Sequence, residues 1–141
     1  MSAAGAPGGV VGIVVVGHGR LAADMVETLE SIVGPLEAVE GVATTPEEGP
    51  HSILDRVAQA VLRVNRGSGV VVLTDMLGDT ASNVSLRIAR QNSNVEVVTG
   101  VNMPMLIKLA TSRVDTTATH LARFLRRYGQ DHILWATNPE T

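Results

Sequence analysis

The sequence contains no cysteine and only three aromatic residues among 141 positions. Without cysteine, disulfide frameworks, thiolate catalysis and cysteine-based zinc sites are all excluded, and the composition suits a reducing compartment such as the cytoplasm. The three aromatics, Phe124, Tyr128 and Trp135, are too few for a base-stacking platform. The core must therefore be built from Val, Leu, Ile and Ala.

The chain also lacks a concentrated charge of one sign. Its formal net charge is −3, and its basic residues are scattered except for Arg123, Arg126 and Arg127. Nucleic acid would require a basic patch or stripe, so we expect no nucleic-acid partner.

Long apolar runs are absent as well. The longest candidate, 10–16, is interrupted by Gly12, is too short to span a bilayer, and follows no basic segment of the kind that a secretory signal requires. We expect a soluble, cytoplasmic protein. A length of 141 residues predicts one domain, 1–141, with loose tails at 1–8 and 138–141.

Strand-like and helix-like segments alternate along the chain. β-Branched and apolar runs predict strands, whereas apolar residues recurring every three or four positions predict helices. This alternation predicts an α/β fold, with an open, mostly parallel sheet and helices on both faces. The predicted strands are 9–16, 36–42, 70–73, 95–98 and a short last one at 132–136; the predicted helices are 21–33, 52–64, 80–90, one starting near Pro104, and 116–128.

In open parallel sheets, ligands bind beyond the carboxyl ends of the strands, near the point where the strand order reverses. Three loops occupy such positions here: 17–20, 74–80 and 100–103. We therefore look for functional residues in these loops.

His18 follows the first predicted strand between Gly17 and Gly19 and directly precedes a helix. Flanking glycines let the backbone approach an anion closely, and the N–H groups at a helix start can hold it. This placement suits a phosphoryl group carried on the imidazole. The plainer alternative is a tight turn with a capping histidine.

Asp75 ends the next central strand, at the same edge of the sheet. A carboxylate there can accept a hydrogen bond from one ring nitrogen of His18 and leave the other nitrogen as the nucleophile. Capping its own loop is the alternative role for Asp75. Three polar residues at the start of the following helix, Thr80, Ser82 and Asn83, could donate hydrogen bonds to phosphate oxygens. Ser82 is the one best suited to serve as a capping residue instead.

Three segments carry a family resemblance: GIVVVGHG, VVVLTDMLGDTASN and VVTGVNMPMLIKL. In this order and spacing they resemble the mannose-type IIA domains of the bacterial phosphoenolpyruvate-dependent sugar phosphotransferase system (PTS). The resemblance implies that His18 accepts a phosphoryl group from an HPr-like donor and passes it to a IIB-type partner. It also implies that Asp75 orients the ring. From their places beside His18 and at the start of the next helix, we expect Gly19, Thr80 and Asn83 to lie at the phosphate.

The same resemblance implies a homodimer in which the last short strand, antiparallel to its neighbour, is exchanged between subunits. It implies contact with the membrane only indirectly, through a transporter complex, and no cofactor. One departure stands out, because Asp79 occupies a position where sugar-uptake members commonly have glycine. Either Asp79 turns outward as a helix cap, or its charge weakens phosphate binding.

Other functions stay open on the sequence alone. The chain is also compatible with a phosphodonor subunit of dihydroxyacetone kinase, a regulatory module that senses phosphorylation state, or a small-molecule binding domain without covalent chemistry. A metal site is not expected, because His18, His51, His120 and His132 lie in unrelated parts of the fold and no metal-binding spacing connects them.

Overall fold

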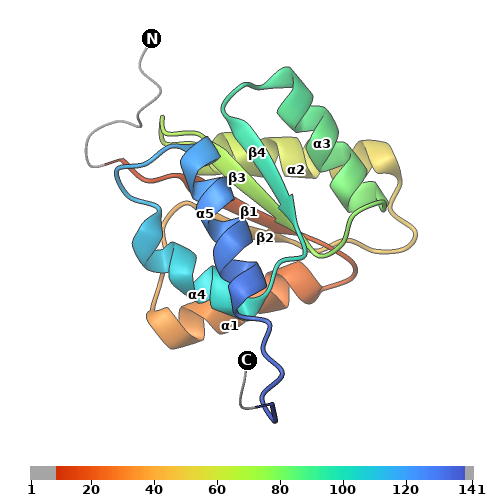
Figure 1. The fold of residues 1–141 in the computed structure, drawn as a ribbon. Coiled ribbons are helices and arrows are strands. Elements are labelled where there is room, and N and C mark those ends of the chain that lie inside the picture. The colour runs from red at the N-terminus through yellow and green to blue at the C-terminus, as the bar shows by residue number, and fades with distance from the viewer. Residues whose placement is uncertain (1–8, 139–141) are drawn as a thin grey trace.

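The computed structural model describes residues 9–138. Within them, four parallel strands form one sheet in the order β2-β1-β3-β4 (Figure 1). β1 and β3 lie at the centre, and every one of their residues is buried, which accounts for their continuous apolar character. The strands are β1 (Gly12–Val16), β2 (Val39–Val42), β3 (Val70–Thr74) and β4 (Val95–Thr99).

Helices cover both faces of this sheet (Figure 1). One face carries α1 (Leu21–Val33), α4 (Met103–Ser112) and α5 (Ala118–Asp131), and the other carries α2 (Pro50–Val64) and α3 (Thr80–Gln91). Among residues 9–138, no helix combines the length and the apolarity needed to cross a bilayer.

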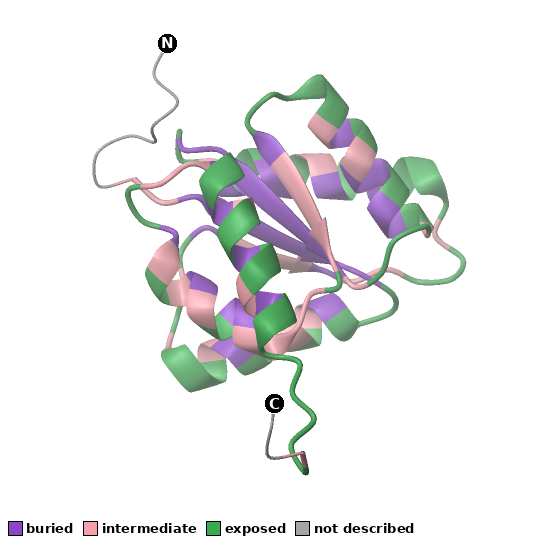
Figure 2. Cartoon of the chain, in the orientation of Figure 1, coloured by how far each residue is buried: buried purple, intermediate pink, exposed green. Residues whose placement is uncertain are grey.

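Successive residues of the central strands point to opposite faces and so build two separate cores. Val14 and Val16 pack toward α2 and α3, whereas Ile13 and Val15 pack toward α1, α4 and α5. Figure 2 shows this arrangement as buried central strands, with a partly buried edge strand β4, between helices whose outer sides are exposed. Two apolar layers on a parallel sheet hold the strand ends in fixed positions, and with them the loops that follow.

The α/β architecture predicted from the sequence is confirmed. Each predicted helix is present, and the four parallel strands lie within or close to the predicted ranges. The largest boundary shifts are three residues: β1 begins at Gly12 instead of residue 9, β2 begins at Val39 instead of residue 36, and α5 ends at Asp131 instead of residue 128. Most of the predicted tails, 1–8 and 139–141, lie outside the described residues.

The last predicted strand, 132–136, is not a strand within this chain. α5 continues to Asp131, and the residues after it form turns and irregular structure. A strand forms only where it hydrogen-bonds to another strand. After the longer helix α5, the chain leads away from its own sheet (Figure 1), so this segment meets no strand among the described residues. Ile133, Leu134 and Trp135 are consequently exposed.

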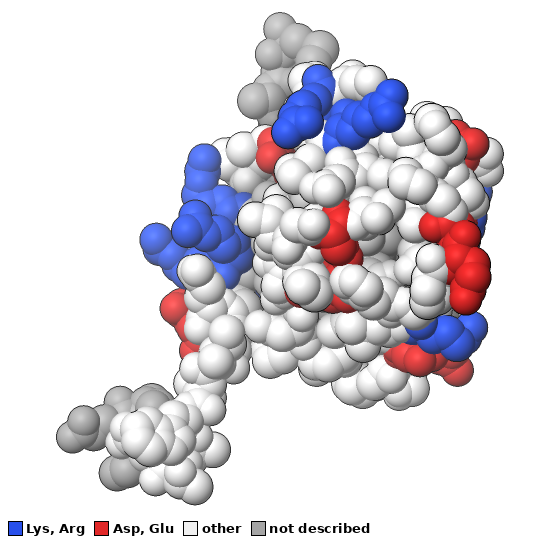
Figure 3. All heavy atoms as spheres, turned by 90° about the vertical axis from the view of Figure 1, so that its right-hand side faces the viewer, with Lys and Arg blue, Asp and Glu red and all other residues white. Residues whose placement is uncertain are grey.

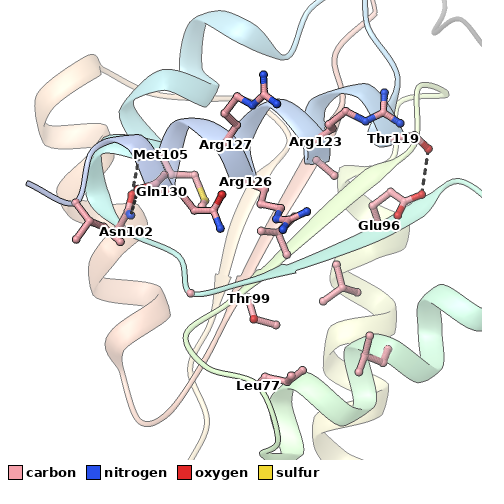
Figure 4. A pocket seen from close by; sticks show the side chains of 17 residues that line it. Leu77, Glu96, Thr99, Asn102, Met105, Thr119, Arg123, Arg126, Arg127 and Gln130 are labelled. Atoms are coloured by element: carbon pink, nitrogen blue, oxygen red, sulfur yellow. Dashed lines mark hydrogen bonds between the residues drawn. The ribbon is translucent and has the colours of Figure 1, made fainter.

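β4 is an edge strand, and a groove of about 850 Å³ runs beside it. The groove lies between β4, α5 and the loop that precedes α3 (Figure 4). Arg126 extends from α5 toward β4, whereas Arg127 points away from the groove (Figure 4).

Candidate functional site

His18 and Asp75 come together because their strands are neighbours at the switch point of the sheet. β1 ends at Val16 and β3 at Thr74, paired in register, and the chain leaves the sheet in different directions from these strands. Both residues therefore follow strand ends at the same edge, as predicted, and the crevice between these ends is where open α/β sheets bind ligands.

Two hydrogen bonds join His18 to Asp75. The backbone N–H of His18 donates to Oδ2 of Asp75 at 3.0 Å, and the ring atom Nδ1 lies 2.8 Å from the same oxygen. Oδ1 of Asp75 accepts from the backbone N–H of Met76 at 2.9 Å, so both carboxylate oxygens are held. An ionised carboxylate only accepts, which assigns the proton to Nδ1 and leaves the lone pair of Nε2 as the nucleophile.

The electrostatics of this pair match that assignment. The hydrogen bond from His18 to Asp75, followed by the charges of Asp75 and Asp79, raises the pKa of His18 above 6.5. Burial alone would raise the pKa of Asp75. The N–H groups of His18 outweigh burial, however, and the pKa of Asp75 lies below its usual 3.8. Asp75 thus stays ionised and holds the ring in one orientation.

Asp79 takes part in the same site. One carboxylate oxygen, Oδ1, accepts from the backbone N–H of Ser82 at 2.8 Å and caps α3. The other, Oδ2, lies 3.2 Å from Nδ1 of His18. Asp79 is thus a helix cap, but it does not turn outward as the first alternative supposed, because its second oxygen faces His18. The effect of its charge on phosphate binding stays a prediction.

A cavity of about 460 Å³ opens beside His18. Gly19, Thr80 and Asn83, the residues expected at the phosphate, line it. Ser82 does not line it; its hydroxyl accepts from Gly78 and donates to Asp79, which makes it a structural residue of the helix start. The predicted loop at 100–103 contributes to the groove beside β4 instead.

Sequence reasoning missed the loop between β2 and α2. Thr44 donates its hydroxyl to the carbonyl of Gly17 at 2.8 Å and its backbone N–H to the carbonyl of Gly19 at 2.9 Å, which clamps both sides of His18. Thr44, Thr45 and Glu48 also line the cavity. The Thr, Pro and Glu composition of this loop does not point to His18. The sequence signal for its place at the site was only that the loop follows a parallel strand.

The histidines do not converge on a metal site in the part of the chain that the structure describes. His18 lies with Asp75 and Asp79, whose nearest ligand-type atoms fall within 4.8 Å of one another and of the ring. Hydrogen bonds among these three residues and the backbone already account for the arrangement. We assign no metal to it.

Comparison with known proteins decides the family. Residues 12–125 match the family of PTS system fructose IIA components (EIIA-man). The chain belongs to this family. This match confirms the resemblance drawn from the three sequence segments. PTS IIA components in general are phosphotransferases.

Curated relatives and solved structures agree with this assignment. The chain is similar to the PTS system sorbose-specific EIIA component of Lacticaseibacillus casei, with 25% identity over 84% of this chain and 86% of that protein. It is 29% identical, over 74% of its length, to the PTS system mannose-specific EIIAB component of Escherichia coli K12, of which it covers 32%. The mannose/sorbose specific IIA subunit from Enterococcus faecalis superposes with a TM-score of 0.83 at 27% identity, covering 94% of this chain and 99% of that one.

Proposed function

We propose that this IIA component is a cytoplasmic phosphocarrier that accepts a phosphoryl group on Nε2 of His18 from an HPr-like donor and passes it to a IIB-type partner. The observation that carries the proposal is the pairing of Nδ1 with the carboxylate of Asp75 at 2.8 Å, which leaves the opposite ring nitrogen unprotonated. With 58% of its side chain exposed, His18 is reachable by another protein's phosphohistidine.

The transfer balances without a cofactor. Nε2 of His18 forms a bond to phosphorus as the bond between phosphorus and the donor's imidazole nitrogen breaks, and the donor's ring leaves with that electron pair. Nδ1 keeps its proton throughout, and Asp75 stabilises the positive charge that the ring gains. In the second transfer, a nucleophile of the partner attacks phosphorus and His18 recovers its lone pair.

The start of α3 supports the transferred group. Thr80 and Asn83 line the cavity at the helix N-terminus, where backbone N–H groups and the helix dipole favour an anion. Gly19 has a φ of +56° and no side chain on that side, so the backbone leaves room beside the ring. These three residues are our candidates for contacts with the phosphoryl oxygens.

Assembly into a homodimer is part of the proposal. β4 is an edge strand beside a groove, and among the described residues the apolar segment 132–136 is not part of a strand. We infer that this segment pairs antiparallel with β4 of a second copy, as the family resemblance implies.

A regulatory output is the second candidate, and one observation favours it. The chain is 33% identical over 133 residues, 92% of its length, to the transcriptional regulatory protein LevR of Bacillus subtilis, of which it covers 14%. In this case, the phosphorylation state of His18 would control a bound protein instead of feeding a IIB-type acceptor. The site chemistry is the same for both outputs.

The deciding experiment is incubation with Enzyme I, HPr and labelled phosphoenolpyruvate, followed by intact-mass measurement. One acid-labile phosphoryl group is expected, lost in His18→Ala and retained in the controls His51→Ala and His120→Ala. Chase with a IIB-type protein then separates the two outputs, because only a carrier loses its label to that acceptor. Labelling that persists in His18→Ala would refute the proposed site.

A further inference from the structure

The carboxylate of Asp79 contacts both the first turn of α3 and the ring of His18. Its Oδ1 is fixed by the backbone N–H of Ser82 in the first turn of α3, and its Oδ2 lies 3.2 Å from Nδ1 of His18. Only 15% of the side chain is exposed, so its position is restrained by packing as well as by the hydrogen bond. Asp75 approaches the same ring nitrogen from the end of β3.

We propose that Asp79 is a positioning residue for phosphoryl transfer: while Nδ1 of His18 donates its hydrogen bond to Asp75, the charge of Asp79 attracts the same ring atom and holds the ring toward the start of α3. The inference rests on the proposed function for its kinetic consequence, but the contact itself can be measured in the unphosphorylated protein.

The other charged groups near the ring leave this role to the two aspartates. Arg20, two residues along the chain, is directed to Asp24 at 3.6 Å. Glu48 lines the same cavity from the loop between β2 and α2, but Arg56 and Ser52 hold its carboxylate oxygens. Asp75 and Asp79 are therefore the carboxylates in direct contact with Nδ1.

The contact between Asp79 and the His18 ring has opposite consequences at acid and at alkaline pH. Both aspartates raise the pKa of His18, so the ring retains a second proton to higher pH than it would beside Asp75 alone. A doubly protonated ring has no lone pair on Nε2 and accepts nothing. Asp79 should thus slow phosphoryl acceptance at acid pH, and should favour it at alkaline pH, where the ring is neutral and only its orientation matters.

Three variants separate this role from helix capping. Asp79→Asn keeps a capping side chain and removes the charge, whereas Asp79→Ser keeps a cap too short to reach the ring. Asp79→Gly removes the side chain altogether. Asp24→Asn is the matched control, because it removes the same charge from a nearby exposed carboxylate that does not contact His18.

The first measurement is an NMR titration of the His18 ring in the unphosphorylated protein, which does not depend on any phosphodonor. We expect the pKa of His18 to fall in all three Asp79 variants and to stay unchanged in Asp24→Asn. An unchanged pKa in Asp79→Asn and Asp79→Ser would overturn the proposal, whatever the protein does with phosphate.

The second measurement is the initial rate of phosphorylation by phospho-HPr from about pH 5.5 to about pH 9. We expect the pH profile of Asp79→Ser to shift to lower pH. On the acid side of the profile, its phosphorylation should be up to about five-fold faster than that of the parent protein, which corresponds to the free energies measured for exposed charge pairs. A profile that coincides with that of Asp24→Asn would overturn the kinetic part. If the pKa shifts but neither protein is phosphorylated, the proposed function fails while the contact stands.

Discussion

A Cβ atom built on Gly17 would lie 2.9 Å from Oδ2 of Asp75, the carboxylate oxygen that accepts both hydrogen bonds from His18. Real Cβ atoms essentially never approach other heavy atoms so closely. Glycine at this position is therefore required by the carboxylate, not by a turn.

Substituting Gly17→Ala should displace the Asp75 carboxylate and release the His18 ring. We expect phosphorylation of Gly17→Ala by phospho-HPr to be at least roughly ten-fold slower, because positioned proton partners typically contribute about 10²–10⁴ in rate. Gly49→Ala is a suitable control, since the same construction at Gly49 meets no atom within 4 Å. Equal rates for the two variants would contradict the steric argument.

Replacing Asp75 tests the pair more directly. Asp75→Ala should fold but accept the phosphoryl group about 10²- to 10⁴-fold more slowly, because both the orientation of the ring and the stabilisation of its charge are lost. Asp75→Asn should retain part of the orientation but not the charge. Slowed transfer with an unchanged circular dichroism spectrum is the expected result, and unimpaired kinetics would leave Asp75 with a structural role only.

The His18–Asp75 pair should also make stability depend on pH. The folded-state pKa of His18 is raised, so its stabilisation is fully present below its ordinary value of 6.5 and is lost as pH rises through the folded pKa. The pKa of Asp75 is lowered, so its contribution to stability is present above pH 3.8 and is lost only as pH falls through its folded-state pKa. The melting temperature of the parent should thus exceed that of His18→Gln more at about pH 5.5 than at about pH 9; the reverse order would contradict the pair.

Buried Arg113 is expected to matter for stability instead of transfer. The residue is only 4% exposed, and its guanidinium donates to the backbone carbonyls of Val11, Glu37 and Ala38, which joins the residues before β1 and β2 to the end of α4. Arg113→Met should cost about 2–3 kcal/mol or more, because buried carbonyls lose their donors. Chemical denaturation measures this loss, and Arg63→Met, at an exposed ion pair, is the control.

The fold was largely predictable because its signals are local. The β-branched run before His18 and the helical spacing after Leu21 each indicate one element, and the order of elements then limits the topology. The contact of His18 with Asp75 followed from that topology, since both residues end central strands. Sequence could not reveal the hydrogen bonds of Thr44 or the position of the Asp79 carboxylate, because these depend on loop conformations with no periodic pattern. It also placed a strand at 132–136, because an apolar segment does not say which chain supplies its partner.

That partner can be tested through Trp135, the single tryptophan of the sequence. In the isolated chain its side chain is 67% exposed, and pairing with β4 of a second copy should bury it. We expect a dimer in light scattering at micromolar concentration and tryptophan emission that shifts to longer wavelength on dilution. Ending the chain at Gln130 should give a monomer that is less stable or aggregates. A full-length monomer, or a truncated chain of equal stability, would exclude strand exchange.

On the proposed function, the exposure of His18 limits how long a phosphoryl group on it would last. More than half of the side chain faces solvent, and Figure 3 shows basic side chains standing in separate groups at the margins of one face, without a continuous band across it. A phosphoryl group on this ring would be open to water while it waits for the next protein. Its lifetime would then depend on how soon that protein arrives, so such a carrier would suit a relay whose occupancy follows the supply of phosphodonor from moment to moment, and not a store that outlasts it.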